Sequence, residues 1–127
     1  MNNVKDETKP VVSLRPDART TTEDGIGVDT SRFSSCSVVL EVGTVSGSSP
    51  TLDIKIQESD DNSSFSDITG AVFTQVIASD ESQEIAIENL NTTRKKFLRA
   101  VATIGGSTPV FNSAVVFVLG RADITPA

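Results

Sequence analysis

The chain has 127 residues and a formal net charge of −6, with one cysteine and no histidine, tyrosine or tryptophan. This length suits a single domain, which buries roughly two-thirds of its unfolded surface and needs no disulfide to complete a core. The negative charge and the absence of tyrosine and tryptophan argue against nucleic-acid binding, and the lack of histidine leaves few groups for acid–base catalysis.

The first ten residues are mostly charged and polar, with Val4 as the one sizeable internal apolar side chain. Such a segment cannot bury enough surface to offset its ordering entropy, so we predict a flexible arm over residues 1–10. The segment also lacks the apolar stretch of a secretory signal. The longest apolar run, 114–120, is far shorter than the ~20 residues that cross a bilayer. We therefore expect no membrane partner and a protein that accumulates in the cytoplasm where it is made.

Beyond the arm, apolar and polar residues alternate with a period of two, which is typical of half-buried strands. In LDIKIQE, for example, Leu52, Ile54 and Ile56 share one face. Strands are expected at 11–14, 37–42, 52–58, 72–78, 83–89, 97–104 and 110–120. The glycine- and serine-rich stretches at 43–50 and 105–109 are predicted to be flexible loop tips.

Short strands separated by turn residues predict an all-β fold, a single antiparallel β-sandwich or jelly-roll-like domain of about seven to nine strands. We place this domain at residues 11–122 and a short tail at 123–127.

The last predicted strand, VFNSAVVFVLG, is apolar on both faces. Phe111, Val115 and Phe117 share one face, and smaller side chains such as Val116 and Val118 occupy the other. A sandwich needs only one of these faces for its own core. The second face is then either a subunit interface or covered by a loop of the same chain.

The polar stretch SDDNSS interrupts the strand pattern at Asp60, Asp61 and Asn62. An EF-hand is excluded because its sixth and twelfth positions, counted from Asp60, would be Phe65 and Ala71. A hairpin turn is the favoured interpretation, since aspartate, asparagine and serine bond their own backbone. A different calcium site stays open, whereas acid–base catalysis by neighbouring carboxylates is disfavoured. We expect Phe65 to begin the return strand and to pack on the Ile54–Ile56 face.

Three other features have plain structural interpretations. Cys36 lies in an apolar run and is expected to be a buried, inert thiol rather than a reactive one. Gly25 and Gly27 lack the third glycine and the strand–turn–helix context of a phosphate-binding loop. The basic run 94–96 is expected to be solvated, with contact to an anionic partner as the alternative.

The segments IKIQESDDNSSFSDI, TRKKFLRAVATI with GGSTP, and AVVFVLGRA resemble small structural proteins from the head modules of tailed bacteriophages. The resemblance covers residues 33–122, and Phe65 stands where relatives often carry tryptophan. It implies a capsid decoration, or cement, protein. Such a protein is a small β-rich domain on the exterior of the virion, bound to the major capsid protein at the outer surface of the mature head. The resemblance further implies a homotrimer with no catalytic residues, metal or cofactors.

We expect the segment from Val4 to Arg19 to contact the capsid, and Phe111, Val115 and Phe117 to mediate self-association. The candidate charge partners in the capsid-binding segment are Lys5, Lys9, Arg15 and Arg19. Two alternatives remain: a structural protein of the phage tail or neck, and a carbohydrate- or receptor-binding β-sandwich. An enzyme is not expected.

Overall fold

The computed structural model describes residues 8–120 and confirms the all-β prediction, with seven antiparallel strands and no helix in that range. The strands are β1 (Thr8–Arg19), β2 (Glu23–Asp24), β3 (Val28–Asp29), β4 (Ser35–Ser59), β5 (Ser66–Val72), β6 (Glu81–Ile87) and β7 (Phe97–Gly120). Within this part of the chain, no helix is long and apolar enough to cross a membrane.

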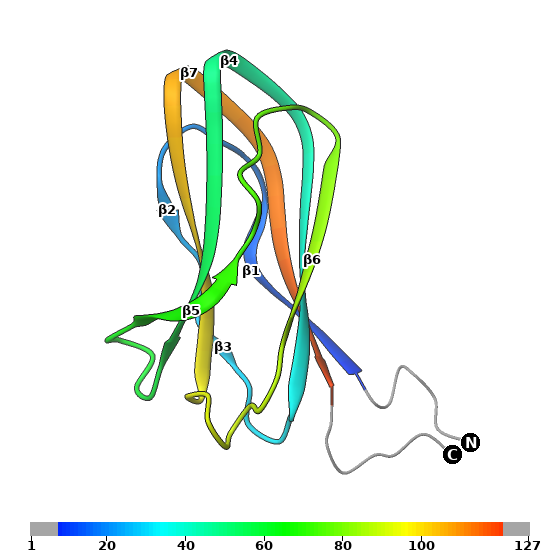
Figure 1. Ribbon diagram of the computed structural model, residues 1–127, viewed down its shortest axis with the longest axis vertical. Coiled ribbons are helices and arrows are strands. Elements are labelled where there is room, and N and C mark those ends of the chain that lie inside the picture. The colour runs from blue at the N-terminus through cyan, green and yellow to red at the C-terminus, as the bar shows by residue number, and fades with distance from the viewer. Residues whose placement is uncertain (1–7, 121–127) are drawn as a thin grey trace, which may run out of the picture.

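Two long strands, β4 and β7, pair with each other from one end to the other and form the frame of the fold. Both strands bend near their middle, at the end of the sandwich opposite the start of β1 and the end of β7 (Figure 1). Gly47 and Gly106 lie at this bend with φ of 113° and 107°, a backbone conformation that side chains other than glycine rarely adopt. The expected loop tips at 43–50 and 105–109 are therefore wrong, because both strands continue through the bend and stay paired, with shifts of register between Val42 and Thr51.

The bend folds the sheet onto itself and creates the two layers of a sandwich (Figure 1). The first layer contains, in order, β1, residues 110–120 of β7, residues 35–46 of β4, and β6. The second layer contains residues 97–105 of β7, residues 51–59 of β4, and β5, with the short β2 and β3 beside β7.

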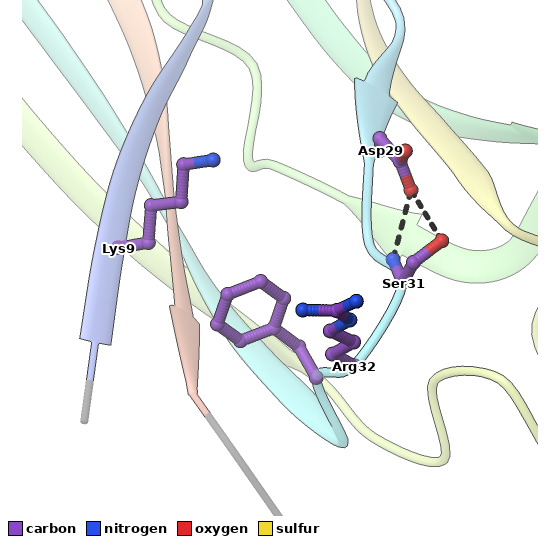
Figure 2. Close-up of a pocket in the computed structure, with 5 residues that line it drawn as sticks. Lys9, Asp29, Ser31 and Arg32 are labelled. Carbon is purple, nitrogen blue, oxygen red and sulfur yellow. Dashed lines mark hydrogen bonds between the residues drawn. The ribbon is translucent and has the colours of Figure 1, made fainter. Parts of the chain in front are cut away.

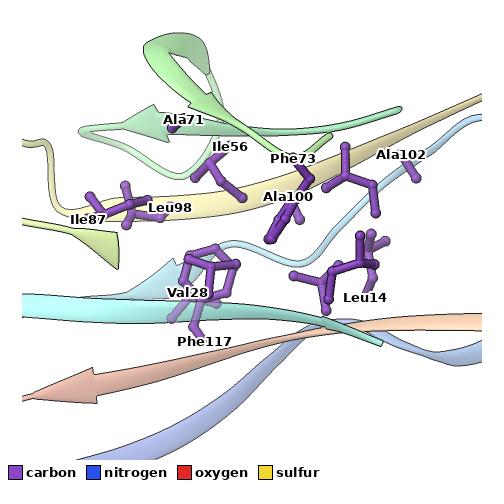
Figure 3. Packing of buried hydrophobic residues seen from close by; sticks show 14 of the residues in the cluster. Leu14, Val28, Ile56, Ala71, Phe73, Ile87, Leu98, Ala100, Ala102 and Phe117 are labelled. Carbon is purple, nitrogen blue, oxygen red and sulfur yellow. The ribbon is translucent and has the colours of Figure 1, made fainter. Parts of the chain in front are cut away.

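Large apolar side chains from both layers fill the space between them (Figure 3). Phe111, Val115 and Phe117 of the first layer are all 0% exposed and face Ile56 and Leu98 of the second. The prediction that these three residues mediate self-association is therefore wrong. Stacked sheets lie about 10 Å apart, and the phenylalanines supply the volume that this gap requires.

The structure also differs from the predicted boundaries of the arm and of one strand. Residues 8–10 belong to β1, where Thr8 pairs with Gly120 and Pro10 with Val118, because main-chain pairing does not require apolar side chains. The rest of the predicted arm, 1–7, and the tail at 123–127 lie outside the described residues. In the predicted strand at 72–78, β5 ends at Val72 and a single bridge follows, between Leu52 and Val76.

Candidate interaction surface

The hairpin tip after β4 is a turn, as predicted. Asp61 Oδ1 accepts hydrogen bonds from the backbone amides of Ser63 and Ser64, both at 2.9 Å, and from Ser59 Oγ at 2.8 Å. These bonds, that of Ser64 first, lower the pKa of Asp61 to about 2. Asn62 takes the left-handed conformation with φ of 59°. The Asp61 carboxylate thus holds the turn, and residues 8–120 contain no group of three potential metal-ligating side chains.

Close packing accounts for the two glycines between β2 and β3. A Cβ on Gly25 would lie 2.7 Å from the carbonyl oxygen of Ala100, and one on Gly27 would overlap Asn62 Oδ1. Cys36 is buried in the core, and loss of hydration raises the pKa of its thiol to about 12. The structure thus supports the structural interpretations of these residues.

Polar and charged side chains make up much of the outward side of the second layer, beside the exposed Val72. Arg99 donates from Nε and Nη2 to Gln57 Oε1 at 3.0 and 2.8 Å, and its Nη2 lies 3.7 Å from Asp24. Lys55 Nζ lies 3.1 Å from Asp67. Ion pairs and hydrogen bonds of this kind keep the charged side chains satisfied at a solvated surface.

Phe65 belongs to that same outward side, with its ring centroid 4.0 Å from the Arg99 guanidinium carbon. The expected packing of Phe65 on the inward Ile54–Ile56 face is therefore wrong. A cation–π contact with arginine provides an alternative to burial in the core.

The outward side of the first layer is apolar at its centre. Strand alternation turns these side chains away from the core, because on β4 and β7 each lies between two buried neighbours, as Val39 does between Val38 and Leu40. The register places Val12, Val116 and Val39 in one row across three strands. We call the set the valine face: Pro10, Val12, Val39, Ala114, Val116 and Val118.

Polar groups border the valine face. Glu41 and Glu84 lie toward β6 and accept hydrogen bonds from Ser82 Oγ and Ser37 Oγ, each at 2.6 Å. Toward the bend, a shallow hollow of about 570 Å³ continues the face between β1, β4 and β7. An apolar centre with a polar border is the usual composition of a protein–protein contact.

A second hollow of about 540 Å³ opens at the end of the sandwich where β1 begins (Figure 2). Lys9, Arg32 and Phe33 line it, together with Asp29 and Ser31. Asp29 Oδ1 accepts hydrogen bonds from Ser31 Oγ and from the Ser31 amide, which lower the pKa of the Asp29 carboxyl. Within residues 8–120 no ion pair joins Lys9 or Arg32, so both cations can meet an anionic partner.

The four predicted charge partners differ in whether their side chains are accessible to another protein. Lys9 and Arg15 are exposed, and Lys5 lies outside the described residues. Arg19 is only 3% exposed. Its guanidinium donates to the carbonyl oxygens of Ser113 and Arg15, and its Nε lies 3.5 Å from Glu23. Arg19 thus joins β1 to β7 inside the domain and is not available to a capsid.

The basic run before β7 is largely satisfied within the chain. Arg94 Nε lies 3.6 Å from Glu58, and Lys95 Nζ lies 3.9 Å from Asp60. Lys96 Nζ lies 5.2 Å from the centre of the Phe97 ring. These contacts support the interpretation of this run as an ordinary solvated surface.

No protein-family model and no curated protein matches the chain. Among solved structures, it is similar to the SPBc2 prophage-derived protein YomS, with 18% identity and a TM-score of 0.50 over 89% of this chain and 92% of that one. It is also similar to a structure of Bacillus endospore appendages, described as a novel family of disulfide-linked pili. That match has 14% identity and a TM-score of 0.49 over 90% of this chain and 86% of the other. At this identity, the likeness to YomS shows a common fold.

Proposed function

We propose that this protein is a non-enzymatic structural subunit of a bacteriophage particle. More specifically, we propose a capsid decoration protein that binds the major capsid protein on the outside of the mature head and acts as a homotrimer. The observation that carries the proposal is the contrast between the two outward sides of the sandwich. One side carries ion pairs and hydrogen bonds, and the other presents the valine face. The fold in common with a prophage-derived protein and the resemblance to head-module proteins support the phage setting.

A decoration protein stabilises a shell by linkage. Contacts that form only when neighbouring capsomers are closely joined favour the joined state by the free energy of binding. Several copies held in one assembly reinforce one another, because each bound copy raises the effective concentration of the others at the shell. Weak individual contacts are therefore sufficient for this role.

The end of the sandwich where β1 begins is the proposed side of capsid contact. Lys9 and Arg32 stand there as cations without ion pairs among the described residues, on a chain whose net charge is −6. An acidic patch on the shell is the complementary partner. Arg15 remains a candidate for the same contact, and Arg19 is withdrawn because it is buried.

The test is sedimentation of the purified chain with particles that lack it. We expect the chain to sediment with mature heads and to raise the temperature at which they release DNA. Lys9→Glu should weaken this binding. The matched control Lys55→Glu reverses an exposed charge on the second layer and should leave it unchanged. Binding to isolated tails but not to heads would favour the tail or neck alternative, and calcium-dependent binding to glycans would favour the receptor-binding alternative.

A further inference from the structure

The valine face lies on the outward side of the first layer, where Pro10 is exposed and its other members are half-buried. Four neighbouring strands about 4.8 Å apart make a layer about 19 Å wide. Val12, Val116 and Val39 lie in one row on the three adjacent strands β1, β7 and β4, and Glu84 on β6 completes this row. The core beneath it is complete without these valines, since Phe111 and Phe117 are already fully buried.

We propose that other copies of this chain cover the valine face, with the β1 edge of one copy beside the β6 edge of the next. This inference rests on the proposed function, because it names the partner of a surface there assigned to assembly. Its evidence is the direction of the strands, their charge and the width of the layer.

Strand direction permits this arrangement. Among the described strands, β1 pairs only with β7 and β6 pairs only with β4, so both strands are edges of the first layer. All pairs in the layer are antiparallel, and β1 and β6 therefore run in opposite directions. Rotation about an axis along the strands preserves these directions. The β6 edge of one copy then lies antiparallel to the β1 edge of the next, as in an ordinary sheet.

The charges favour the same pairing and oppose its alternatives. β1 has two exposed cations, Lys9 and Arg15, with Asp17 as its one exposed carboxylate. β6 has Glu81 and Glu84 and no cation. Pairing β6 with a second β6 would bring glutamates together, whereas pairing it with β1 brings opposite charges together.

The width of the layer indicates how many copies close the ring. The valine faces of three copies, each about 19 Å wide, would form the three sides of a prism around the axis. Each sheet would then lie about 5.5 Å from this axis, which is close to half of the ~10 Å spacing between packed sheets. Valine side chains fill such a space. Four faces would place each sheet about 9.5 Å from the axis and leave a void that valine cannot fill. Three copies therefore fill the space between their valine faces. The end of the sandwich that carries Lys9 lies on the same side of the trimer in all three copies.

Sedimentation equilibrium of the full-length chain and of matched variants tests this inference. We expect the wild type to be a trimer. Val116→Asp places an unpaired charge in the centre of the face and should weaken association by more than about a hundredfold. The matched control is Val72→Asp, which changes a residue that is 57% exposed at the end of β5 and should leave the trimer intact. Circular dichroism and thermal unfolding should show both variants folded, because neither residue belongs to the core.

Charge reversal tests the order of the edges. Arg15→Glu and Glu84→Arg should each weaken the trimer by about fivefold, and the double variant should regain most of this loss. The inference would be overturned if the wild type were a monomer or if the Val116→Asp variant were still a trimer. It would also be overturned if the wild type were a dimer and the double variant did not regain association. A monomer that still binds heads would overturn this inference and the trimeric state, but would leave the proposed binding to the head standing. A trimer that ignores heads would leave this inference standing and remove the proposed function.

Discussion

Replacing Arg19 by alanine tests whether this residue stabilises the domain or serves a partner. Its guanidinium is buried and donates to the carbonyl oxygens of Ser113 and Arg15. Arg15→Ala is the matched control, because Arg15 lies on the same strand with an exposed side chain.

The expected loss of stability follows from the two carbonyl groups. A buried acceptor that loses its donor costs about 1–3 kcal/mol, and the partly buried Arg15 carbonyl costs less than the buried Ser113 carbonyl, so Arg19→Ala leaves a penalty of about 2–4 kcal/mol. The ion pair with Glu23 adds less than about 1 kcal/mol, because the Glu23 side chain is 48% exposed. Removing the charged group also relieves its own desolvation cost, which places the expected loss near the lower end, about 2–3 kcal/mol. Such a change is a large fraction of the 5–15 kcal/mol that is typical of a domain.

Urea unfolding followed by circular dichroism measures this difference. We expect a clearly lower midpoint for Arg19→Ala and a change of less than about 0.5 kcal/mol for Arg15→Ala. Arg19→Lys should fall between them, since lysine retains the charge but not the two-sided geometry of the guanidinium. Equal stability of Arg19→Ala and the wild type, combined with a loss of particle binding, would refute the structural role.

Three further predictions concern the core, the hairpin turn and the thiol. Phe117→Leu should lower the free energy of unfolding by about 1–2 kcal/mol in urea titrations, whereas Val72→Leu at an exposed position should change it by less than about 0.5 kcal/mol. Similar losses for both would contradict the burial of Phe117 in the core. Asp61 has a pKa near 2 in the fold against an ordinary 3.8, so its contribution to stability is complete above pH 3.8 and is lost as the pH falls toward 2. The unfolding midpoint of Asp61→Asn should therefore fall less steeply over that pH range, and an unchanged slope would count against this role. The Cys36 thiol, with a pKa of about 12 in the core, should react with a thiol reagent only when the protein unfolds; rapid labelling of the native protein would show that it is accessible.

The sequence predicts the inward faces well wherever apolar and polar residues alternate. Val38 and Leu40 in one segment, and Ile54 and Ile56 in another, are buried as the period of two requires. The same rule cannot decide the last strand, because both of its faces are apolar. There the volume of the gap between the layers selects the phenylalanines for the inside and leaves the valines outside.

Long-range contacts explain the errors in the candidate site. Arginine is normally a surface residue, and Arg19 is buried only because the Ser113 carbonyl on β7, 94 positions away, accepts its hydrogen bond. The bend in β4 and β7 was likewise predicted as two loops, since glycine and serine indicate a turn but not whether pairing continues through it. The valine face was visible in the sequence only as the second apolar side of one strand, and its extent became clear when the register added Val12 and Val39.

Electron cryomicroscopy of phage particles assembled with and without this chain shows whether the protein is a subunit of the head. We expect additional density on the outside of the head that fits the sandwich, with the valine face buried against protein and the Arg99 side exposed to solvent. Particles that are identical with and without the chain, or a bound chain whose valine face is fully open to solvent, would contradict this expectation.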